Sequence, residues 1–134
     1  HGLLRGIGTA AARAAPGVLG VFTAADLRAA GIGPIPYLPM PGFAMATPAE
    51  APRPALAEDK VRHVGEPVAV VVAETRAQAE DAAELVEIEI EALPAAVATA
   101  AAVEPGAPQV WAGAAGNVGL AWRGGDAAAT EAAF

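Results

Sequence analysis

The segment over residues 65–91 constrains the fold more than any other part of the chain. It starts with a Gly-Glu-Pro turn, and a continuous run of β-branched residues and alanine, Val68–Ala73, follows directly. Such a run, bounded by Gly and Pro, predicts a strand that is buried on both faces and lies at the centre of the fold. The strict alternation of Glu87–Glu91 predicts a second strand, with Ile88 and Ile90 buried and three carboxylates outside.

A helix is predicted between these two strands. Thr75 and Gln78 have the spacing of a capping box, in which two side chains and two backbone N–H groups pair reciprocally, so the helix should run from there through Val86. Its inward face, spaced as one side of a helix, comprises Ala79, Ala82, Ala83 and Val86. Strand, helix and strand form a β-α-β unit, whose crossover should be right-handed if the two strands are parallel neighbours.

The rest of the chain divides into shorter elements around a proline-rich stretch, Gly33–Pro54. Its proline density excludes a helix or a central strand, and we expect an irregular surface loop there. Polar residues mark three helix starts and a glycine marks one helix end: Thr9, Thr23, Asp126 and Gly31. The expected strands are Leu3–Ile7, Val18–Phe22, Lys60–Val64 and Val118–Trp122, and the expected further helices are 9–15, 23–31, 99–103 and 126–134.

Composition excludes several classes of function. A length of 134 residues argues for one domain. The formal net charge is -7 with no cluster of Lys and Arg, which argues against binding nucleic acid or an anionic membrane surface. The absence of cysteine excludes disulfides, thiolate nucleophiles and iron–sulfur ligation by this chain. No apolar run is long enough to span a bilayer, and no signal-peptide pattern follows His1. We therefore expect a cytoplasmic protein, of which this sequence is a piece.

The order of the elements and their punctuating residues is similar to that of one known family. The stretch Arg53–Thr75, with its Val-Gly-Glu-Pro turn and following strand, resembles the a/b-hammerhead domain of the molybdenum hydroxylases. These are the large subunits of the xanthine dehydrogenase, aldehyde oxidase and carbon monoxide dehydrogenase family. The resemblance also covers His1–Asp26, Ala79–Val86, Leu93–Ala95, 116–118 and 125–126. The chain departs from the family's pattern at Gly8, Ile90 and Ala98, each near the end of an element.

The resemblance implies an α+β hammerhead, with a mixed sheet and helices packed on it, that spans residues 1–134 as a single domain. Residues 118–134 would begin the connection to the next domain. In the implied parent enzyme the molybdopterin cofactor belongs to later domains of the large subunit, and 2Fe-2S clusters and FAD belong to other domains or subunits. This chain would be an accessory domain, with those domains and subunits as partners. It would form part of the approach to the active site without a catalytic, cofactor-binding or metal-binding residue of its own.

Few side chains are candidates for chemistry. Gly65 and Glu66 are the candidates for the active-site approach, because a partly desolvated carboxylate in a tight turn could meet substrate or cofactor; a solvated turn residue is the simpler interpretation. His63 is expected to be a strand histidine in contact with its neighbours rather than a ligand. The three carboxylates of Glu87–Glu91 form a flat row, which does not converge as a Ca²⁺ site requires.

Two other functions stay open on the sequence. Lys60 is the chain's only lysine, and its surroundings are similar to the modified hairpin of biotinyl- and lipoyl-carrier domains, although the helix predicted over 75–86 is foreign to such nearly all-β domains. The chain could also be a plain protein-interaction module. Leu3–Ile7 and the C-terminal helix are expected to have poorly satisfied edges, through which the isolated chain could dimerise.

Overall fold

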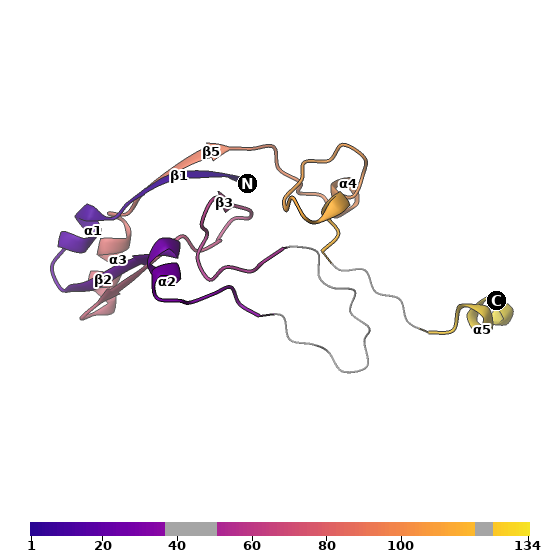
Figure 1. Cartoon of the computed structure of the whole chain (residues 1–134), viewed down its shortest axis with the longest axis horizontal. Helices are drawn as coiled ribbons and strands as arrows, with labels where there is room; N and C mark the ends of the chain where they lie inside the picture. Colours follow the sequence, from indigo (N-terminus) through magenta and orange to yellow (C-terminus); the bar gives the residue numbers. More distant parts are fainter. Residues whose placement is uncertain (37–50, 120–124) are drawn as a thin grey trace.

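The chain folds into two small antiparallel sheets with short helices around them (Figure 1). This computed structural model describes residues 1–36, 51–119 and 125–134. The strands are β1 (Gly2–Gly8), β2 (Val18–Thr23), β3 (Lys60–Val61), β4 (Ala69–Ala73) and β5 (Glu87–Ala92). The helices are α1 (Ala10–Ala14), α2 (Ala24–Ala29), α3 (Arg76–Ala83), α4 (Thr99–Ala102), the 3-10 helix η1 (Ala115–Asn117) and α5 (Ala127–Ala133).

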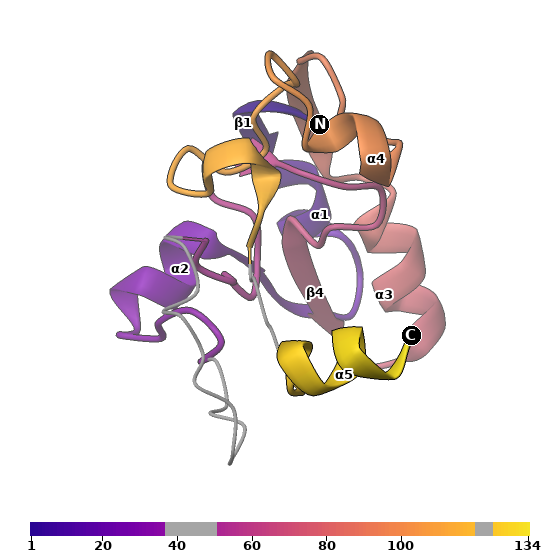
Figure 2. The same cartoon turned by 90° about the vertical axis from the view of Figure 1, so that its right-hand side faces the viewer.

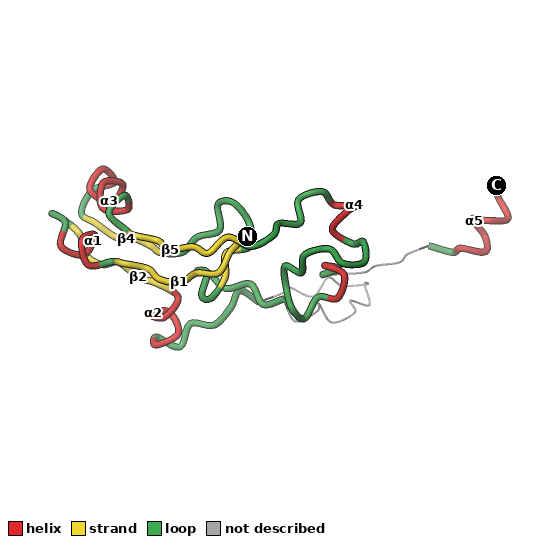
Figure 3. The backbone as a smooth tube through the Cα atoms, turned by 90° about the horizontal axis from the view of Figure 1, so that it is seen from above, coloured by secondary structure: helices red, strands yellow, loops and turns green. Residues whose placement is uncertain are grey.

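A three-stranded sheet has the order β3-β1-β5, and a two-stranded sheet pairs β2 with β4. α1 and α3 lie at one end of the molecule beside the two-stranded sheet, whereas α5 stands apart from the strands (Figures 1 and 3). Viewed from the side, α2 and α3 lie to opposite sides of β4 (Figure 2). The α+β class, with helices packed on a sheet, is confirmed. The expected mixed sheet is wrong for the described residues, because every strand pair among them is antiparallel.

The helices α1, α3 and α5 begin directly after the predicted capping residues Thr9, Thr75 and Asp126. The capping box of α3 is complete, since Thr75 Oγ1 accepts from the Gln78 N–H at 3.3 Å and Gln78 Oε1 accepts from the Thr75 N–H at 3.0 Å. Asp126 accepts from a backbone N–H of α5 at 3.0 Å. Thr9 holds the N-cap position of α1, but its side chain does not cap the helix; its hydroxyl accepts from Arg13 Nε at 3.1 Å instead.

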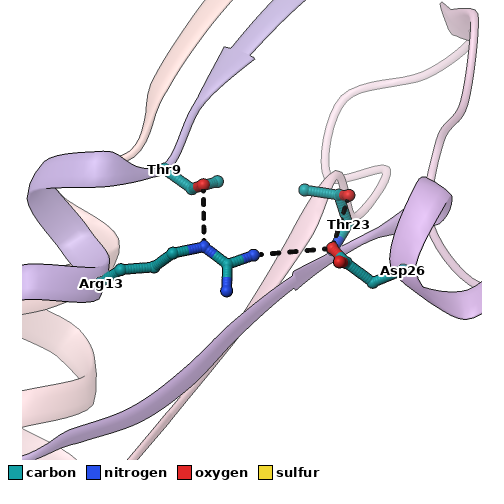
Figure 4. A network of polar contacts seen from close by, with 4 residues as sticks. All are labelled: Thr9, Arg13, Thr23 and Asp26. Atoms are coloured by element: carbon teal, nitrogen blue, oxygen red, sulfur yellow. Dashed lines mark hydrogen bonds and ion pairs between the residues drawn. The ribbon is translucent and has the colours of Figure 1, made fainter.

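Asp26, in the first turn of α2, links α2 to α1 (Figure 4). Asp26 Oδ2 accepts from the Thr23 N–H at 2.7 Å and from the Thr23 hydroxyl at 2.8 Å, and Arg13 Nη2 lies 3.7 Å from the same oxygen. The Thr23 N–H and then its hydroxyl hold the pKa of Asp26 below its usual range, and Arg13 adds a smaller effect in the same direction. α2 ends near Gly31, which takes the expected left-handed conformation at a φ of 73°.

The buried core of the described residues is small and consists mainly of alanine. Its members are Ala12, Val21, Ala51, Leu56, Ala57, Ala82 and Ala114. α3 packs on β4 and α1 packs on β2, so the helices contribute Ala82 and Ala12 to this core. The predicted inward face of α3 is confirmed at Ala82, whereas Ala83 is exposed. The helix also ends at Ala83 and does not reach Val86.

The prediction that the strand over Val68–Ala73 is buried on both faces is wrong. β4 alternates instead: Val71 is half-buried, while Val70 and Val72 are exposed on the opposite face. Among the described residues β4 has one strand partner, β2, and although α3 packs on β4, Val70 and Val72 stay exposed. The predicted order of strand, helix and strand is present as β4, α3 and β5. The two strands lie in different sheets, so they are not the parallel neighbours that a right-handed crossover would join.

The prediction that Ile88 and Ile90 are buried is also wrong, since 43% and 49% of their surface is exposed. The alternation itself is right. Ile88 lies opposite Ile7 and Ile90 opposite Leu4, whereas the glutamates of β5 share the other face. The described residues supply no layer that covers the isoleucine face of β5.

β1 is the middle strand of its sheet. Gly2 and Leu3 pair with β3 on one side and with β5 on the other, so Leu3–Ile7 does not start as an open edge. The predicted open edge is wrong at Leu3, and the Leu4 N–H also has a partner, the Asp59 carbonyl at 2.9 Å. For the remainder of this strand the open edge stays a prediction, as does dimerisation.

Three expected segments differ in extent. The strand over Lys60–Val64 is reduced to β3, because the chain turns directly after Val61. The two ends of Gly33–Pro54 are joined where the Ile35 N–H donates to the Arg53 carbonyl at 2.7 Å, and the intervening residues 37–50 lie outside the described part. The strand expected over Val118–Trp122 falls mostly on 120–124, also outside it. In the described segments, no helix combines the length and the apolar character needed to cross a bilayer.

Candidate functional site

The turn between β3 and β4 holds both residues expected at an active-site approach. Gly65 has a φ of 84°, a left-handed conformation that favours glycine, and nothing lies within 4 Å of where its Cβ would be. Glu66 is half-buried, and its Oε2 accepts a hydrogen bond from the Arg62 N–H. Ala57 donates its N–H to the Pro67 carbonyl at 2.8 Å on the other side of the turn. Glu66 therefore closes this turn, and Gly65 stands exposed at its tip.

Arg62, at the start of the turn, is a charged side chain that is largely enclosed. Only 10% of the side chain is exposed, and its guanidinium carbon lies 3.5 Å from the ring centroid of Trp111. Nη1 donates to the Lys60 carbonyl at 3.0 Å, and Nη2 lies 3.5 Å from Asp59 Oδ1. A cation placed over an indole face is attracted by the ring quadrupole. Arg62 therefore holds residues 103–114, between α4 and η1, against the turn, and we call this segment the Trp111 loop.

Asn117 holds the Trp111 loop in shape. Its Oδ1 accepts from the Val110 N–H at 2.8 Å, and its Nδ2 donates to the carbonyls of Ala102 and Pro108 at 2.8 and 2.9 Å. Asn117 has a φ of 56°, which asparagine tolerates better than most residues. These bonds tie η1 to the end of α4 and to the segment directly before Trp111, and Trp111 is positioned through them.

A cleft of about 790 Å³ adjoins Arg62 and Trp111, between α2 and the ends of the proline-rich stretch. Its apolar walls include Leu27, Ile32, Pro34, Pro52, Leu56 and Val110. Its charged side chains are largely paired, Arg28 with Glu58 and Arg62 with Asp59. The cleft offers apolar surface between paired charges, an arrangement that suits packing better than acid–base chemistry.

The match to a family model decides how these elements are related to known proteins. Residues 1–94 match the model described as the aldehyde oxidase and xanthine dehydrogenase a/b hammerhead domain. The chain belongs to this family. The match spans the strands from β1 to β5 and includes the turn with Glu66 and Arg62, while the Trp111 loop lies beyond it.

Relatives of this hammerhead domain are large subunits of oxidoreductases. It is 45% identical over 93 residues to the nicotine 6-hydroxylase large subunit of Paenarthrobacter nicotinovorans, which covers 69% of this chain and 11% of the relative. It is 41% identical over 108 residues to the carbon monoxide dehydrogenase large chain of Afipia carboxidovorans, which covers 81% of this chain and 12% of the relative.

A solved structure, that of the Cu,Mo-CO dehydrogenase, superposes with a TM-score of 0.66 at 39% identity and covers 80% of this chain and 12% of the solved chain. The hammerhead domain thus spans 11% and 12% of the two curated relatives described above. These matches confirm the family expected from the turn and strand over residues 53–75.

The remaining candidate side chains do not converge on the turn. His63 is exposed in the turn rather than in a strand, with Nδ1 3.1 Å from the Val64 carbonyl oxygen. Lys60 lies within β3, paired across the sheet with Leu3, so it does not occupy the tip of a hairpin as the carrier hypothesis requires. In the described ranges, no three His, Asp or Glu side chains gather as a metal site would need.

The contact that sequence reasoning missed is the one between Arg62 and Trp111. Arg62 was part of the family-like stretch and gave no separate signal, and Trp111 lies outside every predicted element. The one hint was the Gly-Asn-Val segment at 116–118, which resembles the family and supplies Asn117. A contact between segments so distant along the chain leaves no local pattern.

Proposed function

We propose that this chain is the accessory hammerhead domain of the large subunit of a molybdenum-containing hydroxylase or dehydrogenase. It contributes to the structure of that subunit and to the approach to its active site, and it is not catalytic alone. The observation that carries this proposal is the family match over residues 1–94, supported by 45% and 41% identity to two oxidoreductase large subunits. The parent enzyme holds the molybdopterin in later domains and iron–sulfur clusters and flavin in other domains or subunits. It works in the cytoplasm.

The proposal assigns the β3–β4 turn to the approach to the active site. Its support is the geometry of the turn: Glu66 and Arg62 hold the backbone, while Val64 and Gly65 project into solvent. A fixed, protruding turn can shape an entrance without taking part in chemistry. Because Glu66 accepts a hydrogen bond from the Arg62 N–H, it fixes the conformation of the turn.

The central experiment compares the full-length protein that contains this chain with residues 1–134 alone. We expect stoichiometric molybdenum by elemental mass spectrometry, and hydroxylation or dehydrogenation of small substrates, in the full-length protein only. A full-length protein without molybdenum would contradict the family function. Stoichiometric molybdenum in residues 1–134 alone would contradict the accessory role.

A second experiment tests the position of the turn. Val64 is fully exposed, so Val64→Trp adds bulk at the turn without touching the bond between Glu66 and Arg62. In the full-length enzyme we expect a several-fold increase in KM that grows with substrate size, while the molybdenum content stays unchanged. Val97→Trp, at another exposed position after β5, is the matched control. Equal KM values for Val64→Trp and Val97→Trp would mean that the turn is not part of the approach to the active site.

A further inference from the structure

In the part of the chain that the structure describes, one face of the two-stranded sheet is buried more deeply than the other. Val21 is fully buried and Val71 half-buried on the side where α1 and α3 pack. On the opposite side, Phe22 lies across from Val70 and Gly20 from Val72 in the register of β2 and β4. Phe22, Val70 and Val72 are exposed by 42%, 46% and 41%. We call Phe22, Val70 and Val72, with Gly20 between them, the outer face.

The outer face consists of the apolar residue types that are usual in a protein core. Neither β2 nor β4 contains a charged residue, and the three exposed side chains are aromatic or β-branched. Leu19, exposed by 68%, lies at the irregular register between Val18 and Gly20. Contiguous exposed apolar surface, rather than single exposed apolar residues, marks interaction sites. This face therefore calls for a covering layer.

We propose that the outer face docks on an apolar surface of the remaining part of the same large subunit. This inference rests on the proposed function. Since the chain spans only 11% and 12% of the large subunits that it resembles, most of such a polypeptide is available to cover the face in every copy. A wholly apolar interface is typical of permanent contacts rather than transient ones. A second copy is the poorer occupant, because two chains that each carry a net charge of -7 repel each other.

Cysteine labelling tests this docking, because residues 1–134 contain no cysteine. Val72→Cys places a thiol on the outer face of the full-length large subunit. Arg76→Cys is the control on α3, where 91% of the Arg76 side chain is exposed. Both variants are treated with a maleimide in the isolated large subunit, and labelling is followed by peptide mass spectrometry. We expect the thiol at position 72 to react at least ten-fold more slowly than the thiol at position 76, with equal rates after denaturation.

Every other outcome overturns the docking. Ready labelling at position 72 means that the face stays bare. Protection that appears only after partner subunits are added assigns the face to another subunit, and protection that depends on protein concentration assigns it to a second copy. Val70→Cys repeats the measurement should Val72→Cys fail to fold. The molybdenum content of the same samples keeps the proposals apart: a labelled position 72 with molybdenum retained contradicts the docking alone.

Discussion

Asp26 is the side chain through which α1 and α2 are joined, so its ionisation is coupled to folding. Its Oδ2 accepts hydrogen bonds from the N–H and the hydroxyl of Thr23 and lies 3.7 Å from Arg13 Nη2 (Figure 4). These donors favour the charged carboxylate, and the pKa of Asp26 is lowered in the folded chain. The capping contact is local in sequence, but the contact to Arg13 adds a tertiary component.

We expect Asp26 to make the folded chain lose stability in acid. A group whose folded pKa is lowered stabilises the fold above its unfolded pKa of about 3.9, and this contribution disappears as pH falls through the lower folded pKa. Urea unfolding from about pH 6 to about pH 2.5 should therefore show a weaker pH dependence for Asp26→Asn than for the unchanged chain. Asp81→Asn, at an exposed position of α3, should retain the full dependence. Identical curves for Asp26→Asn and the unchanged chain would rule out the coupling.

Arg62 and Trp111 should show a measurable interaction energy. A double-mutant cycle with Arg62→Met and Trp111→Leu isolates their contact from the other bonds of the guanidinium. We expect a coupling of about 0.5–2 kcal/mol in the free energy of unfolding, because the pair is largely withdrawn from water. Arg76→Met, combined with the same Trp111 variant, should give no coupling, and a zero value for Arg62 as well would make its stacking incidental.

At the scale of elements, helix starts depend on a few neighbouring residues and can be tested one at a time. Thr75 caps α3 through its hydroxyl, whereas Thr9 holds the equivalent position of α1 without capping it. Thr75→Ala should reduce the free energy of unfolding by about 0.5–2 kcal/mol. Thr9→Ala, as the matched control, should change it by less than about 0.5 kcal/mol. Urea denaturation measures both, and equal losses would mean that the hydroxyl of Thr75 does not stabilise the helix.

The same locality explains which elements could be predicted. The capping box of Thr75 and the left-handed Gly31 are properties of four or five consecutive residues, and both were read correctly. The alternation of β5 was read correctly too, but its burial was not. Burial depends on what covers a face, and Ile88 and Ile90 lack a covering layer among the described residues. The error over β4 has the same origin, since a β-branched run indicates a strand without saying how many layers surround it.

In the candidate site, too, local features could be predicted from the sequence and contacts between distant segments could not. The turn at Gly65 and Glu66 could be predicted because glycine and proline punctuate it. The partners of that turn could not, because Arg62 is held by a tryptophan that lies far along the chain in a loop without periodicity. Strand pairing is similarly non-local: β1 pairs with β5 and β2 with β4, and no pattern within one strand specifies its neighbour.

At the scale of the whole molecule, the question is where the folding unit ends. The family match stops at residue 94, but Arg62 inside it is covered by Trp111 outside it. Ala114, from the same outer segment, belongs to the buried core. We therefore propose that the domain extends past the matched region, and that the loop with α4 and η1 is an integral part of it rather than a connection.

Truncation separates these possibilities. Residues 125–134 are exposed throughout, so a chain of residues 1–119 should unfold within about 0.5 kcal/mol of the full 134 residues. A chain of residues 1–94 loses Trp111 and Ala114 and exposes the guanidinium of Arg62, and it should be less stable by about 2–5 kcal/mol. Urea denaturation followed by circular dichroism compares the three chains. Equal stability of 1–94 and 1–119 would place the boundary of the folding unit at the end of the family match, and the contact between Arg62 and Trp111 would then join two units instead of completing one.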